Sequence, residues 1–130
     1  DSNDEQLAYL DTLEHIQVAV SDETTDLTTG TAKLTFRMPY AFEVVEVRAS
    51  VNTAPTGANI VVDINEGGAS ILSTKLSIDA TEKTSVTAAT PAVISDSSLA
   101  DDSEITIDID QIGSTIAGTG LKVVLIGKRV

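Results

Sequence analysis

The sequence predicts an all-β protein: an antiparallel β-sandwich, jelly-roll-like, with about eight short strands and a short N-terminal arm. Apolar and polar residues alternate in segment after segment, as in strands with one buried and one solvent-exposed face. The chain is rich in β-branched Val, Ile and Thr, whereas aromatic residues make up only 3% of it. Turn signals separate the alternating segments, which favours a sandwich over an α/β fold.

Residues 1–14 differ in character from the rest and form the predicted N-terminal arm. Ser2 and Glu5 have the spacing of a capping box. Three leucines follow at near-helical intervals, which indicates a short helix. Two interpretations stay open: the arm contacts a partner, or it packs on its own domain.

Residues 15–130 are predicted to form one sandwich domain. Pro39 marks a strand end or bend, and Glu66-Gly67-Gly68 is a hairpin turn. The alternation in 43–51 puts Val45 and Val47 on the same apolar face. Residues 77–102 are expected to be a long connection with one short strand near 92–95. The other predicted strands are 15–20, 31–38, 43–51, 59–65, 69–75, 104–110 and 121–129.

The apolar faces of these segments predict the core. Its members should be aliphatic, because few aromatic residues are present. The predicted core residues are Ile16, Val18, Leu34, Phe36, Val47, Ile64, Ile107, Ile109 and Val123.

The composition argues against several classes of function. Twenty acidic and eight basic residues give a formal charge of −12, which repels nucleic acid and anionic membranes. The chain has no cysteine, so disulfides and thiolate metal sites are not available. No apolar run has the length of a membrane span.

The candidate catalytic residues are few. His15 is the only histidine, and a lone histidine without a nucleophile or second ligand nearby is usually structural. Asp108 and Asp110 share one face of a strand, and paired carboxylates can bind Ca²⁺ or act as acid and base. No loop with calcium-ligand spacing accompanies them, and strand aspartates usually form a solvated face. We therefore predict no enzyme activity, no cofactor and no metal.

Partner contacts are expected from the arm and from the Pro39 bend, where two aromatic residues should be partly exposed. The arm carries an apolar set that a lone terminus would leave in water. The predicted contact residues are Leu7, Tyr9, Leu10, Leu13, Tyr40 and Phe42.

The ordered segments TGT…FRMP, VRASV, VDIN, SILSTK, ITIDID and GLKV resemble a module of tailed-bacteriophage structural proteins. The resemblance covers roughly residues 15–130, and it includes phages of marine and freshwater bacteria such as cyanophages. Proteins with this module are virion structural, tail-fibre or capsid-decoration proteins. The resemblance implies a noncatalytic β-sandwich, commonly trimeric in decoration proteins, whose N-terminal region often makes the attachment.

Three functions follow as expectations. The first is a homotrimeric decoration (cement) protein that binds the major capsid protein on the outer capsid surface and joins adjacent subunits. The second is a host-binding head domain of a tail fibre or tail spike. The third is an enzyme such as a glycan depolymerase, for which only Asp108 and Asp110 offer a starting point. The compact size of the chain favours the first, since a fibre protein normally carries a shaft.

Overall fold

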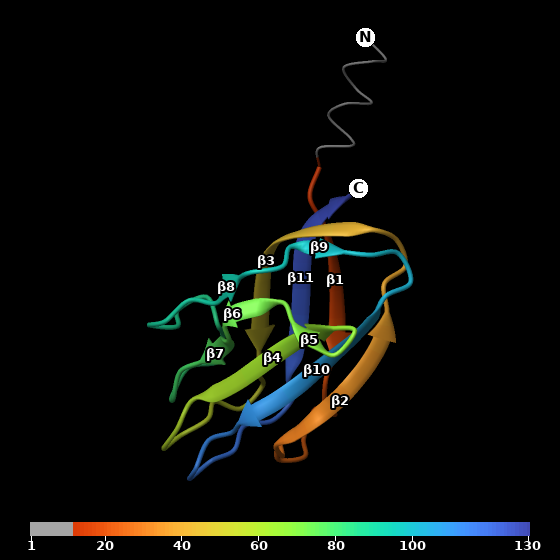
Figure 1. Cartoon of the computed structure of the whole chain (residues 1–130). Helices are drawn as coiled ribbons and strands as arrows, with labels where there is room; N and C mark the ends of the chain where they lie inside the picture. The colour runs from red at the N-terminus through yellow and green to blue at the C-terminus, as the bar shows by residue number, and fades with distance from the viewer. Residues whose placement is uncertain (1–11) are drawn as a thin grey trace.

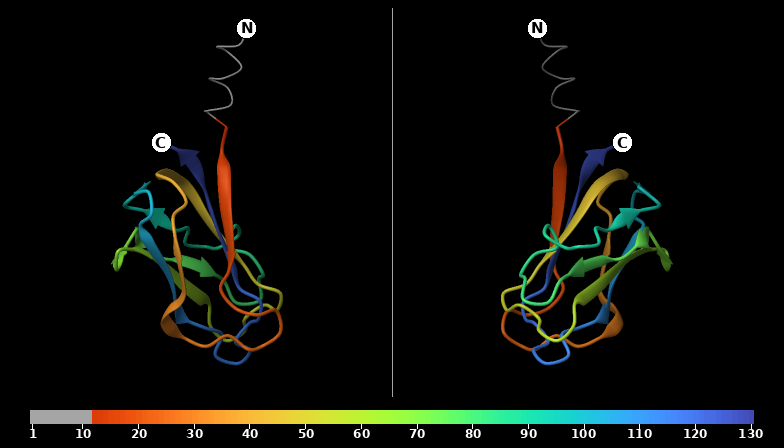
Figure 2. Two further views of the ribbon diagram at one scale, coloured as in Figure 1. Left: turned by 90° about the vertical axis from the view of Figure 1, so that its right-hand side faces the viewer. Right: turned by 90° about the vertical axis from the view of Figure 1, so that its left-hand side faces the viewer.

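The computed structural model describes residues 12–130, which form two large antiparallel β-sheets packed face to face and one small two-stranded sheet (Figures 1 and 2). None of the described residues belongs to a helix long and apolar enough to cross a membrane. The arrangement confirms the predicted antiparallel β-sandwich. The strands are β1 (Glu14–Ala19), β2 (Gly30–Arg37), β3 (Phe42–Ser50), β4 (Ile60–Glu66), β5 (Ala69–Ser70), β6 (Leu72–Thr74), β7 (Leu76–Ile78), β8 (Val93–Ile94), β9 (Ser98–Leu99), β10 (Glu104–Gln111) and β11 (Lys122–Arg129).

The order of the strands shows how the chain winds between the sheets. One sheet has the order β1-β11-β3-β9, and in the other β2, β10 and β4 are followed by β5 and β7, which both pair with β4. The first strand thus pairs with the last, β2 with β10, β3 with β9 and β4 with β7, always antiparallel. These pairings join strands that are far apart in the sequence, and the jelly-roll assignment of the sandwich stays a prediction.

The region after β4 is partly as predicted. Gly67 and Gly68 have φ angles of 59° and 87°, as the central residues of a tight hairpin turn require, and β5 pairs with β4. The expectation of one strand over 69–75 is wrong. Ile71 is buried and separates β5 from β6, and β6 pairs with β8 instead. The predicted short strand near 92–95 is β8, whereas β7 and β9 were not predicted, because two or three residues are too few to show an alternation.

A β-bulge in β3 corrects the predicted face of Val45. The ladder between β3 and β11 shifts register at Gly127, which is the partner of Val44, while the residue before it is the partner of Glu46. Val45 is therefore an extra residue on β3, and its side chain is 49% exposed. Val47 follows with its side chain buried, as predicted.

The core lies between the two sheets and is almost entirely aliphatic. Five of the nine predicted core residues are buried, namely Val47, Ile64, Ile107, Ile109 and Val123. The other four pack against the core but are only partly buried, because they lie on β1 and β2, the edge strands of the two sheets. They are Ile16, Val18, Leu34 and Phe36.

Candidate functional site

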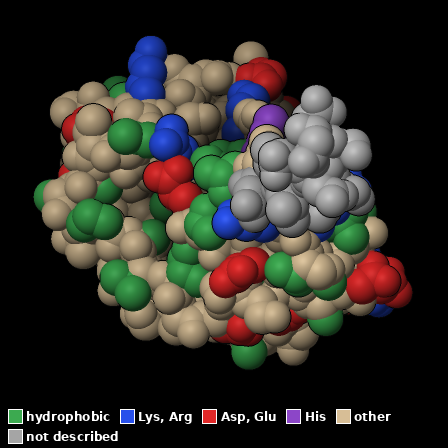
Figure 3. Space-filling model, turned by 90° about the horizontal axis from the view of Figure 1, so that it is seen from above, with side chains coloured by type: hydrophobic (Ala, Val, Ile, Leu, Met, Phe, Trp, Pro, Cys, Tyr) green, Lys and Arg blue, Asp and Glu red, His purple; other side chains and the backbone are tan. Residues whose placement is uncertain are grey.

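The best-defined polar cluster near the predicted contact residues lies where β1 begins beside the end of β11 (Figure 1). We call this end of the sandwich the arm end. There, Glu14 Oε2 accepts hydrogen bonds from Arg129 Nε at 2.8 Å and from the Tyr40 hydroxyl at 3.0 Å. The Arg129 guanidinium carbon also lies 4.2 Å from the centre of the Tyr40 ring. Figure 3 views the molecule from this end and shows side chains of both charges around it.

The charges of this cluster stabilise each other. Hydrogen bonding from Arg129, and secondarily from the Tyr40 hydroxyl, lowers the pKa of the Glu14 carboxyl below its ordinary value. The same hydrogen bond raises the pKa of Arg129. The arm end is therefore a fixed polar patch that joins β1, β11 and the turn before β3.

The predicted contact residues divide into three groups. Leu7, Tyr9 and Leu10 lie outside the described residues. Leu13 is 52% exposed, as a contact residue should be, and Tyr40 is partly buried within the cluster described above. Phe42 was expected to be partly exposed, and this is wrong: its side chain is fully buried. It begins β3 on the inner face of the sheet, and its ring centre lies 6.1 Å from that of Tyr40.

The structure brings the predicted carboxylate pair into a larger cluster on the outer face of β10 and β4. Asp108 lies opposite Asp63 of β4. Its two oxygens accept hydrogen bonds from the Ala32 backbone N–H at 2.7 Å and from Asn65 Nδ2 at 3.0 Å. Both oxygens of Asp108 are therefore held by donors from neighbouring strands.

Lys75 supplies the positive charge of this cluster. Its Nζ lies 2.5 Å from an Asp110 oxygen and 4.0 Å from an Asp63 oxygen. Hydrogen bonding to Asp110 raises the pKa of Lys75. Asp63, which is almost completely buried, also accepts a hydrogen bond from Ser70 Oγ at 2.5 Å. These contacts tie β4, β10 and the segment around Lys75 together.

Two other predicted candidates can be placed. His15 is exposed on β1, with Ile126 of β11 as its strand partner. Within residues 12–130, no group of three or more His, Cys, Asp or Glu side chains is arranged to hold a metal ion.

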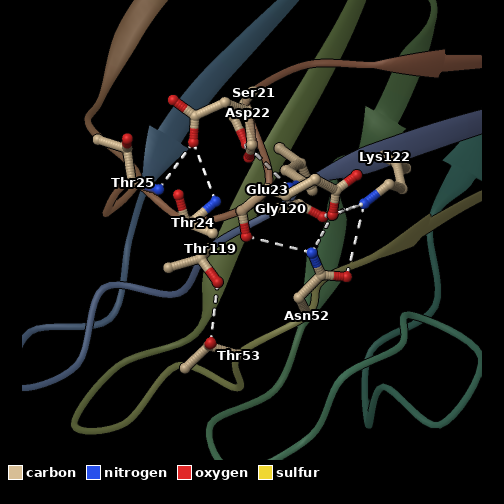
Figure 4. Close-up of polar contacts among 11 residues, drawn as sticks. Ser21, Asp22, Glu23, Thr24, Thr25, Asn52, Thr53, Thr119, Gly120 and Lys122 are labelled. Atoms are coloured by element: carbon tan, nitrogen blue, oxygen red, sulfur yellow. Dashed lines mark hydrogen bonds and ion pairs between the residues drawn. The ribbon is translucent and has the colours of Figure 1, made fainter.

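The end of the sandwich opposite the arm end holds a second polar cluster, which the sequence reasoning treated only as turns (Figure 4). Asp22 accepts hydrogen bonds from the backbone N–H groups of Thr25 at 2.7 Å and Thr24 at 3.0 Å, which lower its pKa. Lys122 Nζ lies 2.7 Å from Glu23 and lowers the pKa of that carboxyl. The cluster joins the loop after β1 to the start of β11, and its contacts are internal.

A groove of about 410 Å³ lies beside β3. It is mostly apolar, and three of the residues that line it are exposed valines: Val45, Val86 and Val93. The sequence reasoning missed it because the bulge in β3 turns Val45 outward, and the loop that carries Val86 has no clear pattern. A signal was present in the two adjacent valines at 44 and 45, which break strict alternation.

No protein-family model, curated protein or solved structure matches the chain significantly. The resemblance to phage structural modules therefore stays a prediction.

Proposed function

We propose that the protein is a non-enzymatic structural component of a phage virion. In this proposal it is a decoration protein that binds the major capsid protein on the outer surface of the shell and stabilises contacts between capsid subunits. It acts as a homotrimer, and the N-terminal arm contributes to attachment or to contacts between the three copies.

The observation that carries the proposal is the ordered run of segments that resembles phage structural modules. VRASV, VDIN and ITIDID lie mainly or wholly on β3, β4 and β10, which are long strands of the two sheets. The resemblance therefore extends over strands of the sandwich core and is not confined to its loops.

The arrangement of the candidate polar groups supports a structural role. Asp108 and Asp110, the starting point for an enzyme, are held by Asn65, a backbone N–H and Lys75. The arm end supports a role for the arm, because the chain enters the sandwich there beside the fixed cluster of Glu14, Tyr40 and Arg129. A contact made by the arm would therefore be transmitted directly to both β1 and β11.

An image reconstruction of the intact virion tests the proposed location. We expect density for the sandwich on the outer shell, in groups of three, next to the major capsid protein. Density at the tip of a tail fibre or spike would replace this function by the tail alternative. A virion without the protein in either place would overturn both.

Removal of the arm tests its role. The deletion should remove residues 1–11 and keep Glu14, because Glu14 belongs to β1 and binds Arg129. We expect lower occupancy on the virion, a mass in light scattering below that of three chains, or both. Unchanged mass together with unchanged occupancy would contradict a role for the arm.

An activity assay tests the non-enzymatic part. Purified protein should not degrade host glycan. Reproducible turnover that is abolished by Asp108→Asn would overturn this part of the proposal.

A further inference from the structure

The groove beside β3 has the character of a binding surface. The side chains of Val45, Val86 and Val93 are 49%, 61% and 50% exposed, and all three line the same hollow. Apolar side chains scattered singly over a surface need no explanation, but a cluster around a groove is typical of an interaction site.

The groove also runs along an open strand edge. Ala49 of β3 exchanges hydrogen bonds with Ser85, so its backbone groups point away from β11. Residues two apart on a strand point the same way, so the backbone of Val47 faces the groove. β9 pairs only with Phe42 and Glu43, and no strand among residues 12–130 pairs with β3 at Val47. Such an edge is a ready place for another chain to bind.

The charges near the groove are complementary to the N-terminal segment. Arg48 lines the groove, where it forms an ion pair with Glu46 at 2.9 Å. Lys83 immediately precedes the groove-lining loop and forms no ion pair with any described residue. Residues 1–11 contain four acidic residues and no Lys or Arg. The outer face of the other sheet instead carries the carboxylates of Asp63 and Asp108, and it would repel the same segment.

We propose that the groove beside β3 binds residues 1–11 of a second copy of the chain. The apolar side chains of Leu7, Tyr9 and Leu10 contact Val45, Val86 and Val93, and acidic residues of the segment lie near Arg48 and Lys83. This inference rests on the homotrimer in the proposed function and specifies which surface receives the arm.

The path of the chain favours a second copy over the same one. β1 begins at the arm end with Glu14 and runs away from that end. Its residue Ile16 lies level with Val47 across β11, so the groove beside Val47 lies beyond the first residue of β1. A segment that returned to its own groove would have to reverse direction just before Glu14, where β1 begins. Eleven residues span up to about 36–40 Å, which is enough to reach a neighbour.

Engineered cysteines test this contact directly, since the chain has none of its own. Leu10→Cys protein is mixed with isotopically heavy Val93→Cys protein under mild oxidation, and mixed disulfides are counted by mass spectrometry. We expect at least ten-fold more mixed product than for Leu10→Cys with Ile116→Cys. Ile116 is a matched control, because it is 44% exposed and lies in the loop before β11, outside the groove.

A chain that carries both Leu10→Cys and Val93→Cys separates the two possible occupants. At high dilution a disulfide within one chain would show that the segment folds back, and it would overturn the inference. We expect the double mutant to form disulfides between chains. We also expect the two single mutants to give the mixed product. Equal yields for Val93 and Ile116 would also overturn it.

Substitutions without cross-linking give a second measurement. Val93→Asp and Leu10→Asp should each lower the mass in light scattering to that of one chain, whereas Ile116→Asp should leave it unchanged. A trimer that survives both substitutions contradicts the inference.

If the mixed disulfide is absent but virions still carry the protein, only this contact is wrong. If the disulfide forms but no virion carries the protein, the proposed function is wrong and the contact stands.

Discussion

Gly127 of β11 lies so close to β3 that a Cβ atom at this position would be 1.9 Å from the backbone oxygen of Glu43. This close approach occurs at the bulge, where Gly127 is the partner of Val44 and Val45 becomes the extra residue. The absence of a side chain at Gly127 therefore permits the register that directs Val45 into the groove.

We predict that Gly127→Ala lowers the free energy of unfolding by about 1–3 kcal/mol, because the backbone strands must separate to admit the methyl group. Urea denaturation measures the change. Gly30→Ala is the matched control: there the nearest atom to a new Cβ is Cδ of the flexible Lys33 side chain, which can move away. Equal losses for the two variants would contradict this account of the bulge.

A second prediction concerns the core. Ile107→Ala should lower the free energy of unfolding by about 2–5 kcal/mol, since its side chain is fully buried between the sheets. Val45→Ala removes apolar atoms from a strand residue that is half exposed, and it should cost much less. An unchanged denaturation midpoint for Ile107→Ala would show that the assignment of faces on β10 is wrong.

Ile107 and Val45 indicate how far the sequence could predict the fold. Ile107 lies in a strict alternation of β10, and such alternation predicted the long strands and much of the core. Val45 lies in a strand with an extra residue, and its face depends on the approach of Gly127, about eighty positions away in the sequence. The short strands β7 and β9 depend on β4 and β3 in the same way. Pairing with distant strands, which a local pattern does not contain, determined these features.

The candidate sites follow the same division. The alternation placed Asp108 and Asp110 on one face of β10, but it could not show that Lys75 reaches both Asp110 and Asp63. Tyr40 was selected because it follows Pro39. Its partners Glu14 and Arg129 come from the two ends of the described chain and meet only because β1 pairs with β11.

The third prediction is a pH dependence at the arm end. The pKa of Glu14 is lower in the folded protein than its ordinary value of 4.5, chiefly through Arg129. Its ionised form therefore stabilises the fold above the unfolded pKa, and this contribution disappears as the pH falls through the lower folded pKa. Glu14→Gln should lower the melting temperature at pH 7, and the difference from the parent should disappear in strong acid.

Glu82→Gln controls for the change in net charge, since Glu82 forms no ion pair with any described residue. Melting temperatures of the three proteins are compared from pH 7 down to pH 2. A difference between parent and Glu14→Gln that stays constant over this range would contradict the role of the Glu14 charge.

The last prediction concerns Lys75, the only lysine or arginine that forms an ion pair in the cluster of Asp63, Asp108 and Asp110 among the described residues. Lys75→Met keeps much of the apolar stem but leaves the carboxylates on one face of the sheet without their counter-charge. Because Lys75 is 47% exposed, water screens part of the repulsion. We expect the free energy of unfolding to fall by about 1 kcal/mol at low salt, with part of the loss recovered as salt screens the aspartates.

Lys33→Met is the matched control, since Lys33 binds the Thr28 hydroxyl and no carboxylate. Denaturation in urea at low and at high salt measures both variants. A loss for Lys75→Met that does not depend on salt would indicate that packing of the stem, rather than charge, explains the effect of Lys75.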